Sequence, residues 1–318
     1  MLTDVQNQPE GVRYLKCVVE GKIKSPLLLV GIEGIGKRFS VTQAVKEVFC
    51  TGTKENTCVC FHCLRIKQDN HPDFVTLTSV DGKDLGVDLV RENIEVAGHY
   101  PSVAPLKFFF IDDADRLTTP AANALLKTLE EPPSCARFLL ATEFYEAVLP
   151  TIRSRCGKVL YQPLSEDFVS DSLKKYESDG TKALVYSRMS GGSIGRAIQY
   201  WGAGRLALRD RVFTLLQYGL STDFPSLFSA IDGLNQDLTL VLRFLDQLLY
   251  DILMSSVDQN RLINLDLLDS LGTLRGSVPT EKWVQLSNGV RTLREKQQTS
   301  NINAQYHLKT LLAEVFAG

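Results

Sequence analysis

The sequence predicts an α/β P-loop domain with helices flanking a parallel sheet, then a small helical lid domain and an all-helical C-terminal domain. Three observations predict this class. Short apolar runs at residues 108–111 and 138–141 lie about one helix apart, as in strands buried on both faces. A glycine-rich loop follows an earlier run, and the apolar spacing is helical beyond Leu164. We expect the domains at residues 1–163, 164–204 and 205–318.

Composition narrows the functional classes. The chain has 318 residues, of which 44% are hydrophobic and 23% charged, as in soluble globular proteins. A net charge of -2 and a pI near 6.1 exclude a strongly basic protein dedicated to nucleic acid. No apolar run reaches membrane-spanning length, and the first residues do not resemble a signal peptide. We therefore expect a cytoplasmic protein without a membrane partner.

The glycine-rich loop is a candidate phosphate site. Helical spacing predicts a first helix within residues 5–21, and residues 27–30 predict a strand. Gly31, Gly34, Gly36 and Lys37 follow, and then a helix to Cys50. Strand, loop and helix in this order bring backbone N–H groups and a helix N-terminus to one anion, and the lysine adds a positive charge. The alternative is a plain glycine turn with a surface lysine.

Arg38 departs from the usual phosphate loop. The residue after the lysine is normally Ser or Thr, whose hydroxyl binds magnesium. A guanidinium has no lone pair to offer a cation and repels it by charge. The sequence therefore predicts a site that holds ATP or ADP with poor use of magnesium.

A cysteine cluster follows the first α/β unit. Four of the seven cysteines, Cys50, Cys58, Cys60 and Cys63, lie within fourteen residues. Four thiolates complete a tetrahedral zinc site, so we expect structural zinc in the loop at residues 50–63. His62 is a possible substitute ligand, and a loop of free thiols is the alternative.

The longest informative stretch runs from residue 106 to residue 156. Its first strand ends in Asp112 and Asp113, at the carboxyl edge where parallel sheets bind ligands. The alternative for this pair is hydrogen bonding to loop amides. A helix is predicted from Thr118 or Thr119 to Glu130. Lys127, Glu130 and Glu131 on it form either a solvated face or a surface toward a partner.

The remaining elements are also predicted from spacing. We expect a strand at residues 74–77 and a helix at 86–98, then three short helices within 165–201. Arg196 falls early in the third of these. Residues 238–254 predict a strongly apolar helix, and residues 283–293 and 306–316 predict amphipathic ones.

The order of motifs carries a specific resemblance. After the phosphate loop and the cysteines come Asn70-His-Pro-Asp73, Gly86-Val-Asp-Leu-Val-Arg-Glu92, Asp112-Asp-Ala-Asp115, Asn123-Ala-Leu-Leu-Lys-Thr-Leu-Glu-Glu-Pro-Pro133, Leu139-Leu-Ala-Thr142 and Ile152-Arg-Ser-Arg-Cys156. This series resembles bacterial-type sliding-clamp loader subunits, which are AAA+ ATPases. The resemblance covers most of residues 1–200. Beyond residue 205 it extends only to an all-helical collar domain.

The resemblance implies partners and residue roles. It implies a hetero-pentamer with other clamp-loader subunits, which acts on the sliding clamp and on primer-template DNA. Arg155 would be an arginine finger for a neighbouring subunit's nucleotide, where positive charge stabilises phosphoryl transfer. Thr142 and Arg196 match nucleotide-contacting positions of active relatives. For Arg196 the alternative is an ion pair with a nearby carboxylate.

Two branches of this family differ in ATP turnover. Gamma/tau subunits hydrolyse ATP, whereas delta-prime subunits keep the fold and have usually lost turnover. Arg38, Asp113 in place of a glutamate, and Glu143 after Thr142 all depart from the active pattern. Aspartate is one methylene shorter than glutamate, so Asp113 would misplace the water that attacks the nucleotide, and the rate of hydrolysis depends strongly on such positioning. We therefore favour the delta-prime type; the alternatives are an active motor subunit and, more remotely, a zinc-dependent DNA-binding adaptor.

Overall fold

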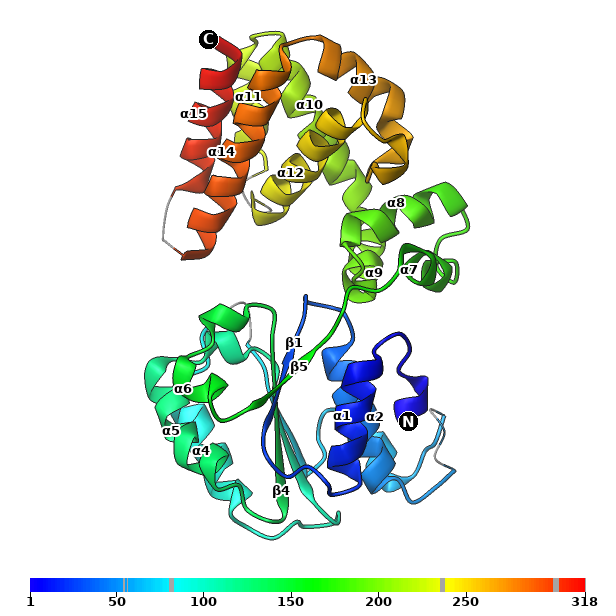
Figure 1. The fold of residues 1–318 in the computed structure, drawn as a ribbon, viewed down its shortest axis with the longest axis vertical. Coiled ribbons are helices and arrows are strands. Elements are labelled where there is room, and N and C mark those ends of the chain that lie inside the picture. The colour runs from blue at the N-terminus through cyan, green and yellow to red at the C-terminus, as the bar shows by residue number, and fades with distance from the viewer. Residues whose placement is uncertain (54, 56, 80–82, 235–237, 300–302, 318) are drawn as a thin grey trace. The chain divides into compact units, whose positions relative to one another are not determined.

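Two compact units make up the chain. The structure, a computed structural model, describes residues 1–53, 55, 57–79, 83–234, 238–299 and 303–317. The first unit consists of Met1–Leu164 together with Ser193–Gly195, and the second of Ser165–Gly192 together with Arg196–Gly318 (Figure 1). Each unit is described below by itself. The division into three domains stays a prediction.

The first unit alternates strands and helices. Its strands are β1 (Leu27–Val30), β2 (Phe74–Leu77), β3 (Lys107–Ile111), β4 (Ala136–Thr142) and β5 (Gly157–Leu160). Its helices are α1 (Pro9–Val19), α2 (Lys37–Phe49), α3 (Phe61–Lys67), α4 (Val87–Ala97), α5 (Thr119–Glu130) and α6 (Pro150–Arg153). Short 3-10 turns are η1 (Leu2–Asp4), η2 (Ala114–Arg116) and η3 (Tyr145–Ala147). The strands expected at residues 27–30 and 74–77 are confirmed to the residue.

All five strands run parallel, in the order β2-β3-β4-β1-β5. The predicted pair β3 and β4, joined by α5, is confirmed as parallel neighbours. Strand β5 was not predicted. Among the described strands its one partner is β1, at the edge of the sheet, and of its four residues only Val159 is buried. An edge strand with one buried position carries too little apolar pattern to be found from sequence.

Helices cover both faces of the sheet, with α1 and α2 on one side and α4, α5 and α6 on the other (Figure 1). Side chains of a strand alternate between these faces. Phe109 and Phe138 stack in the core under α4 and α5, with ring centroids 5.0 Å apart. On the other face Phe108 meets Phe49 of α2. Both faces are therefore apolar, which is why the strands read as continuous hydrophobic runs.

Local signals explain where two helices begin. Helix α1 lies inside the predicted range of residues 5–21 and starts at Pro9, because the fixed φ of proline suits the first helical position. Helix α5 has Thr118 as its N-cap, whose side chain accepts a hydrogen bond from the amide of Ala121. It ends at Glu130, as predicted.

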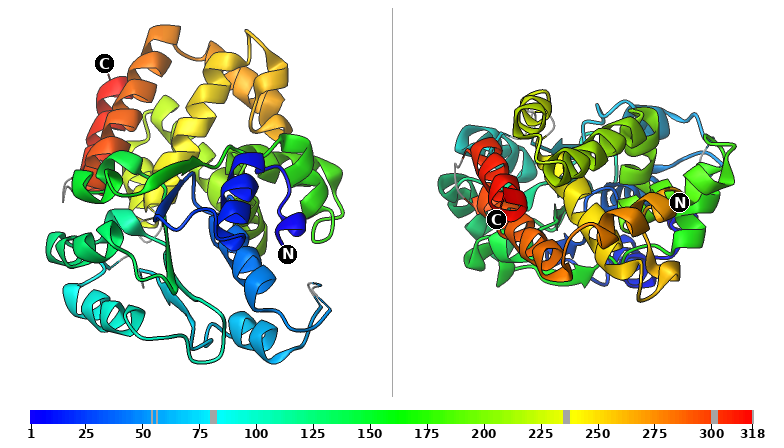
Figure 2. Two further views of the ribbon diagram at one scale, coloured as in Figure 1. Left: turned by 60° about the horizontal axis from the view of Figure 1, so that its bottom comes forward. Right: turned by 90° about the horizontal axis from the view of Figure 1, so that it is seen from above.

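The second unit contains only helices in its described residues, as Figure 2 shows from two directions. The three short helices expected within residues 165–201 are confirmed, and so is the helix at 238–254. No described helix of the chain is long and apolar enough to span a bilayer. The helices are α7 (Glu166–Leu173), α8 (Gly180–Ser190), α9 (Ile194–Gly202), α10 (Arg205–Leu220), α11 (Phe224–Asp232), α12 (Leu238–Met254), α13 (Leu268–Gly276), α14 (Thr280–Thr299) and α15 (Ala304–Ala317), with 3-10 turns η5 (Gln259–Arg261) and η6 (Leu265–Leu267). The first two residues of α9 belong to the first unit.

The second unit contains a cluster of buried polar side chains between α10, α12 and the segment after η5. Asp251 of α12 is fully buried and accepts hydrogen bonds from the amides of Ile263 and Asn264 at 2.7 and 2.8 Å. Arg209 of α10 forms a two-pronged ion pair with Asp266, at 2.8 and 2.7 Å. These contacts fix the segment after η5 against two helices, because buried polar groups without partners are costly.

Candidate functional site

The glycine loop between β1 and α2 has the geometry of a phosphate cradle. Gly34 and Gly36 have φ values of +73° and +106°, a region that side chains rarely adopt. A Cβ at Gly31 would lie 2.8 Å from Cβ of Tyr161, so the backbone can pass there only as glycine. Gly36 is also the N-cap residue of α2, which directs the start of the helix at the loop.

Lys37 lies within this loop. Its Nζ donates to the backbone carbonyls of Gly31 at 2.5 Å and Ile32 at 3.1 Å, and the residue is buried. The predicted phosphate-binding residues Gly31, Gly34, Gly36 and Lys37 are therefore close together. The ammonium is held by carbonyl groups that a bound phosphate would have to replace.

A distant segment is attached to the same loop. The amide of Gly195 donates to the carbonyl of Gly34 at 2.9 Å, and the hydroxyl of Ser193 donates to the carbonyl of Glu33 at 2.6 Å. A Cβ at Gly195 would lie 2.7 Å from Cα of Gly34. Spacing along the sequence gave no signal for this contact. The next residue, Arg196, is buried early in α9 and belongs to the second unit.

Arg38 lies near two acids, and its side chain is 41% exposed. Its guanidinium forms an ion pair with Asp69 at 2.7 Å and approaches Asp112 at 3.9 Å. Burial raises the pKa of Asp112, and the neighbouring Asp113 raises it further, while Arg38 and Lys37 oppose this shift. A guanidinium therefore lies beside the acid that follows β3. Asp69 was not recognised from the sequence, because it follows α3 and shares no motif with Arg38.

The other strand-end residues contact nearby loops. Asp113 accepts a hydrogen bond from the amide of Ser79 at 3.0 Å, which is the loop-amide contact considered as the alternative above. The hydroxyl of Thr142, at the end of β4, donates to Asp115 at 2.5 Å and accepts from the amide of Phe144 at 3.0 Å. Asp115 therefore orients Thr142.

Arg155 lies at the end of the sheet where the parallel strands begin, opposite to the end that carries the glycine loop. It precedes β5 by two residues, and β5 begins level with the start of β1, where Gly157 pairs with Leu27. The glycine loop follows the other end of β1. The length of this strand alone, about 10 Å, separates the two edges. Arg155 is therefore remote from Lys37 of its own chain.

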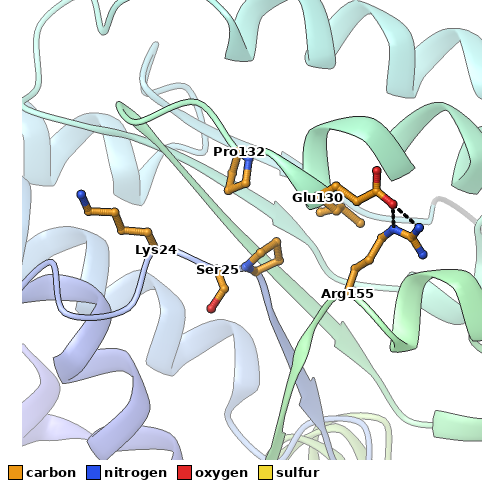
Figure 3. Close-up of a pocket in the computed structure, with 7 residues that line it drawn as sticks. Lys24, Ser25, Glu130, Pro132 and Arg155 are labelled. Carbon is orange, nitrogen blue, oxygen red and sulfur yellow. Dashed lines mark hydrogen bonds and ion pairs between the residues drawn. The ribbon is translucent and has the colours of Figure 1, made fainter.

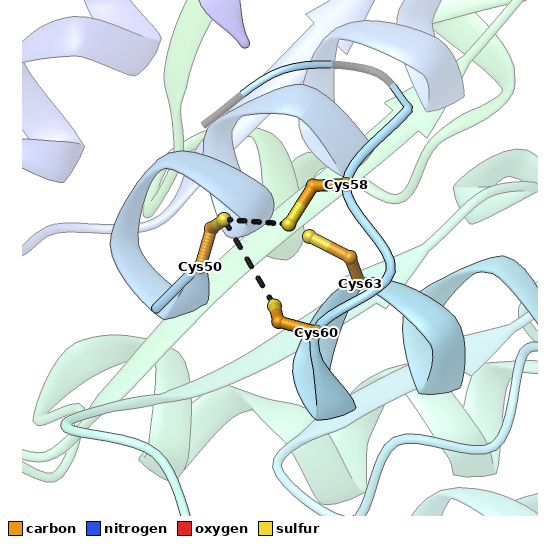
Figure 4. A group of neighbouring side chains, drawn as sticks. All are labelled: Cys50, Cys58, Cys60 and Cys63. Atoms are coloured by element: carbon orange, nitrogen blue, oxygen red, sulfur yellow. Dashed lines mark hydrogen bonds between the residues drawn. The ribbon is translucent and has the colours of Figure 1, made fainter. Parts of the chain in front are cut away.

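The four cysteines form one cluster (Figure 4). Their sulfur atoms all lie within 4.8 Å of one another, with Cys50 at 3.6 Å from Cys58 and 3.9 Å from Cys60. Tetrahedral zinc with bonds of about 2.3 Å needs sulfur atoms about 3.8 Å apart. Burial raises the pKa of Cys63, and hydrogen bonds with Cys60 and Cys50 raise it further. Burial opposes ionisation of Cys60 as well, but backbone hydrogen bonds with Cys63 and Thr51 outweigh it, and the pKa of Cys60 is lowered to about 5. The residues fit structural zinc.

His62 is not part of this cluster. Its Nδ1 lies 2.9 Å from Nε2 of His71, and Nδ1 of His71 accepts the amide of Asp73 at 3.0 Å. That amide contact places the proton of His71 on Nε2, which then donates to His62. Both rings are buried beside Phe49. His62 thus joins the cysteine loop to the segment before β2.

Comparison with known proteins identifies the class. A family model described as "DNA polymerase III, delta subunit" matches residues 8–165. The chain is 28% identical over 314 residues to DNA polymerase III subunit delta' of Escherichia coli K12, which covers 97% of this chain and 93% of that protein. It is 35% identical over 138 residues to subunit delta' of Haemophilus influenzae, or 43% of this chain and 42% of that protein. A solved gamma subunit-related protein of Thermotoga maritima has 19% identity and a TM-score of 0.48, covering 96% of this chain and 98% of that one.

These matches agree on one class of protein. The chain is similar to clamp-loader subunits of DNA polymerase III, over residues 8–165 by the family model and over most of its length by the Escherichia coli relative. Within that class it is similar to the delta-prime subunits of DNA polymerase III.

Proposed function

We propose that the chain is a non-hydrolysing clamp-loader subunit of the delta-prime type, which serves DNA replication by giving Arg155 to a neighbouring subunit's ATP site. The position of Arg155 supports this most directly. It lies at the amino edge of the sheet, away from Lys37, and its side chain is 28% exposed. An arginine so placed can stabilise phosphoryl-transfer charge only on a nucleotide held by another subunit.

The chain's own nucleotide site supports the loss of turnover. Active P-loop enzymes bind magnesium through a hydroxyl after the lysine and an acid at a strand end. Here Arg38 replaces the hydroxyl and stands 3.9 Å from Asp112. One carboxylate oxygen of Asp113 accepts a hydrogen bond from the amide of Ser79, which ties this acid to the neighbouring loop. Residues of the glycine loop and Lys37 remain suited to phosphate, so ATP or ADP can bind without being hydrolysed.

Two further parts of the proposal concern zinc and partners. Cys50, Cys58, Cys60 and Cys63 bind one structural zinc ion, which shapes the loop between α2 and α3. The partners are the other clamp-loader subunits of a hetero-pentamer, with the sliding clamp and primer-template DNA reached through that complex. No large positive net charge is available for independent DNA binding.

Turnover by the assembled complex tests the proposal. Arg155→Ala should reduce turnover at the neighbouring site by about 10³-fold or more, the range for arginine fingers. The observable is DNA-stimulated ATP hydrolysis of the whole complex, with the isolated chain expected to show none. Arg153→Ala is the matched control, because this arginine pairs with Glu146 of its own chain.

Two results would contradict the proposal. Unchanged turnover in the Arg155→Ala complex removes the arginine finger. Steady hydrolysis by the isolated chain that disappears in Lys37→Ala identifies an active motor subunit instead.

A further inference from the structure

An acidic side chain of the same chain holds the guanidinium of Arg155 (Figure 3). Nε of Arg155 donates to Oε1 of Glu130 at 2.7 Å, and Nη2 donates to the same oxygen. Glu130 is the last residue of α5, whereas Arg155 follows α6. Two separate elements therefore bring this pair together.

The remaining donors of Arg155 are also engaged. Nη1 donates to the carbonyl of Thr151 at 2.9 Å and to the hydroxyl of Ser154 at 3.2 Å. An arginine has five N–H donors, and these contacts use four of them. The strong mode of phosphate binding is two-pronged and needs two parallel N–H groups. Arg155 therefore has no two-pronged face to offer while it binds Glu130.

The ion pair between Arg155 and Glu130 is weak enough for a phosphate to replace Glu130. The side chains of Arg155 and Glu130 are 28% and 49% exposed, and ion pairs at such positions contribute little to stability. They line an open pocket of about 560 Å³ that also includes Lys24. Figure 3 shows the ammonium of Lys24 directed away from Arg155, so it does not compete for Glu130. A phosphate carries more negative charge than one carboxylate and can displace it.

We propose that Glu130 is a positioning residue that holds Arg155 in a resting orientation and competes with the neighbouring subunit's nucleotide for it. The inference rests on the proposed function of Arg155 and adds a step to it. The ion pair must open before the finger engages, so Glu130 lowers turnover until the subunits close on the nucleotide. Engagement then exchanges one carboxylate for phosphate oxygens.

The test compares complexes assembled with variant chains. Glu130→Gln removes the charge and keeps the size, so basal kcat/KM for ATP, measured without clamp or DNA, should rise about two- to fivefold, the range expected for an exposed ion pair. Glu131→Gln is the matched control: it removes the same charge from the next residue, which is exposed and outside the pocket. It should leave basal kcat/KM unchanged.

A second comparison separates this inference from the function on which it rests. In the Arg155→Ala background, Glu130→Gln should have no effect, because the residue acts only through the arginine. Suppose that Arg155→Ala lowers turnover, but Glu130→Gln has the same basal kcat/KM as Glu131→Gln or a lower one. The resting orientation is then refuted and the arginine finger stands. If Arg155→Ala itself has no effect, the proposed function fails first. Circular dichroism of each isolated variant checks that the fold is intact.

Discussion

Single residues in this chain anchor loops to the sheet. Asp73 shows it most clearly: its carboxylate accepts the amides of Ser102, Val103 and Ala104 at 2.7 to 2.9 Å. Burial tends to raise the pKa of Asp73, but the three amides outweigh it, and the pKa is lowered. The charged carboxylate thus replaces the water that these amides would otherwise need.

Replacing Asp73 by Asn should reduce the free energy of unfolding by about 1–3 kcal/mol at neutral pH. The folded pKa lies below the unfolded value of about 3.9, so the contribution is present above that value and is lost as the pH falls through the folded pKa. The difference from wild type should therefore shrink in acid. Urea unfolding of wild type and Asp73→Asn, at neutral pH and at a pH below the folded pKa of Asp73, measures this difference in the free energy of unfolding. Asp84→Asn, at an exposed position, is the control, and an equal loss there would contradict the role of Asp73.

The sequence identified residues that lie in a chemical motif, but it did not identify the side chains that contact them. The glycines, Lys37, Arg38 and the four cysteines could be named because each lies in a local pattern. Contacts such as Arg38 with Asp69 and Arg155 with Glu130 join residues that lie 31 and 25 positions apart. No periodicity along the chain encodes such pairs, since they depend on how the elements pack.

Among the elements, the four cysteines between the end of α2 and the start of α3 pack in a small cluster of their own. Met1, Cys50 and Cys63 form a small buried cluster, separate from the core beneath the sheet. If the cysteines bind zinc, Cys63→Ser should lower bound metal below about half an ion per chain and make the loop sensitive to proteolysis. Elemental analysis and limited proteolysis measure these effects.

Cys135→Ser is the matched control for this prediction. Cys135 lies outside the cluster, with its sulfur near the carbonyl of His99. Full metal content in Cys63→Ser, or equal metal loss in Cys135→Ser, would argue against the zinc site.

The strands were predictable to the degree that they are buried. Strand β1 was predicted to the residue, and β3 and β4 within two residues, because they are covered on both faces and the apolar run is continuous. Strand β2 was also predicted to the residue; it is an edge strand, but three of its four residues are apolar and Phe74 and Leu77 are buried. Strand β5 is exposed at three of its four positions and left no such run. The strand order β2-β3-β4-β1-β5 was not predicted, since spacing does not say which strands are neighbours.

At the scale of the whole molecule, the two units have separate stabilising contacts. Asp251→Ala would leave the amides of Ile263 and Asn264 without their acceptor, at a cost of about 3 kcal/mol. Because these contacts lie in the second unit, amide hydrogen exchange should accelerate there while strands β1 to β5 keep their protection. Asp269→Ala, exposed in the first turn of α13, is the control. Equal acceleration in both units would mean that they unfold together.

The attachment of Ser193 and Gly195 to the glycine loop has a consequence for synthesis on the ribosome. Glu33 and Ser193 are 160 positions apart, so the loop emerges long before the residues that bind it. Closing so large a loop costs chain entropy, which contacts formed late in folding must offset. The nascent sheet can assemble once β5 has emerged. Its glycine loop acquires its last backbone partner only when Gly195 leaves the exit tunnel, so a chain that stops earlier ends with an incomplete phosphate cradle.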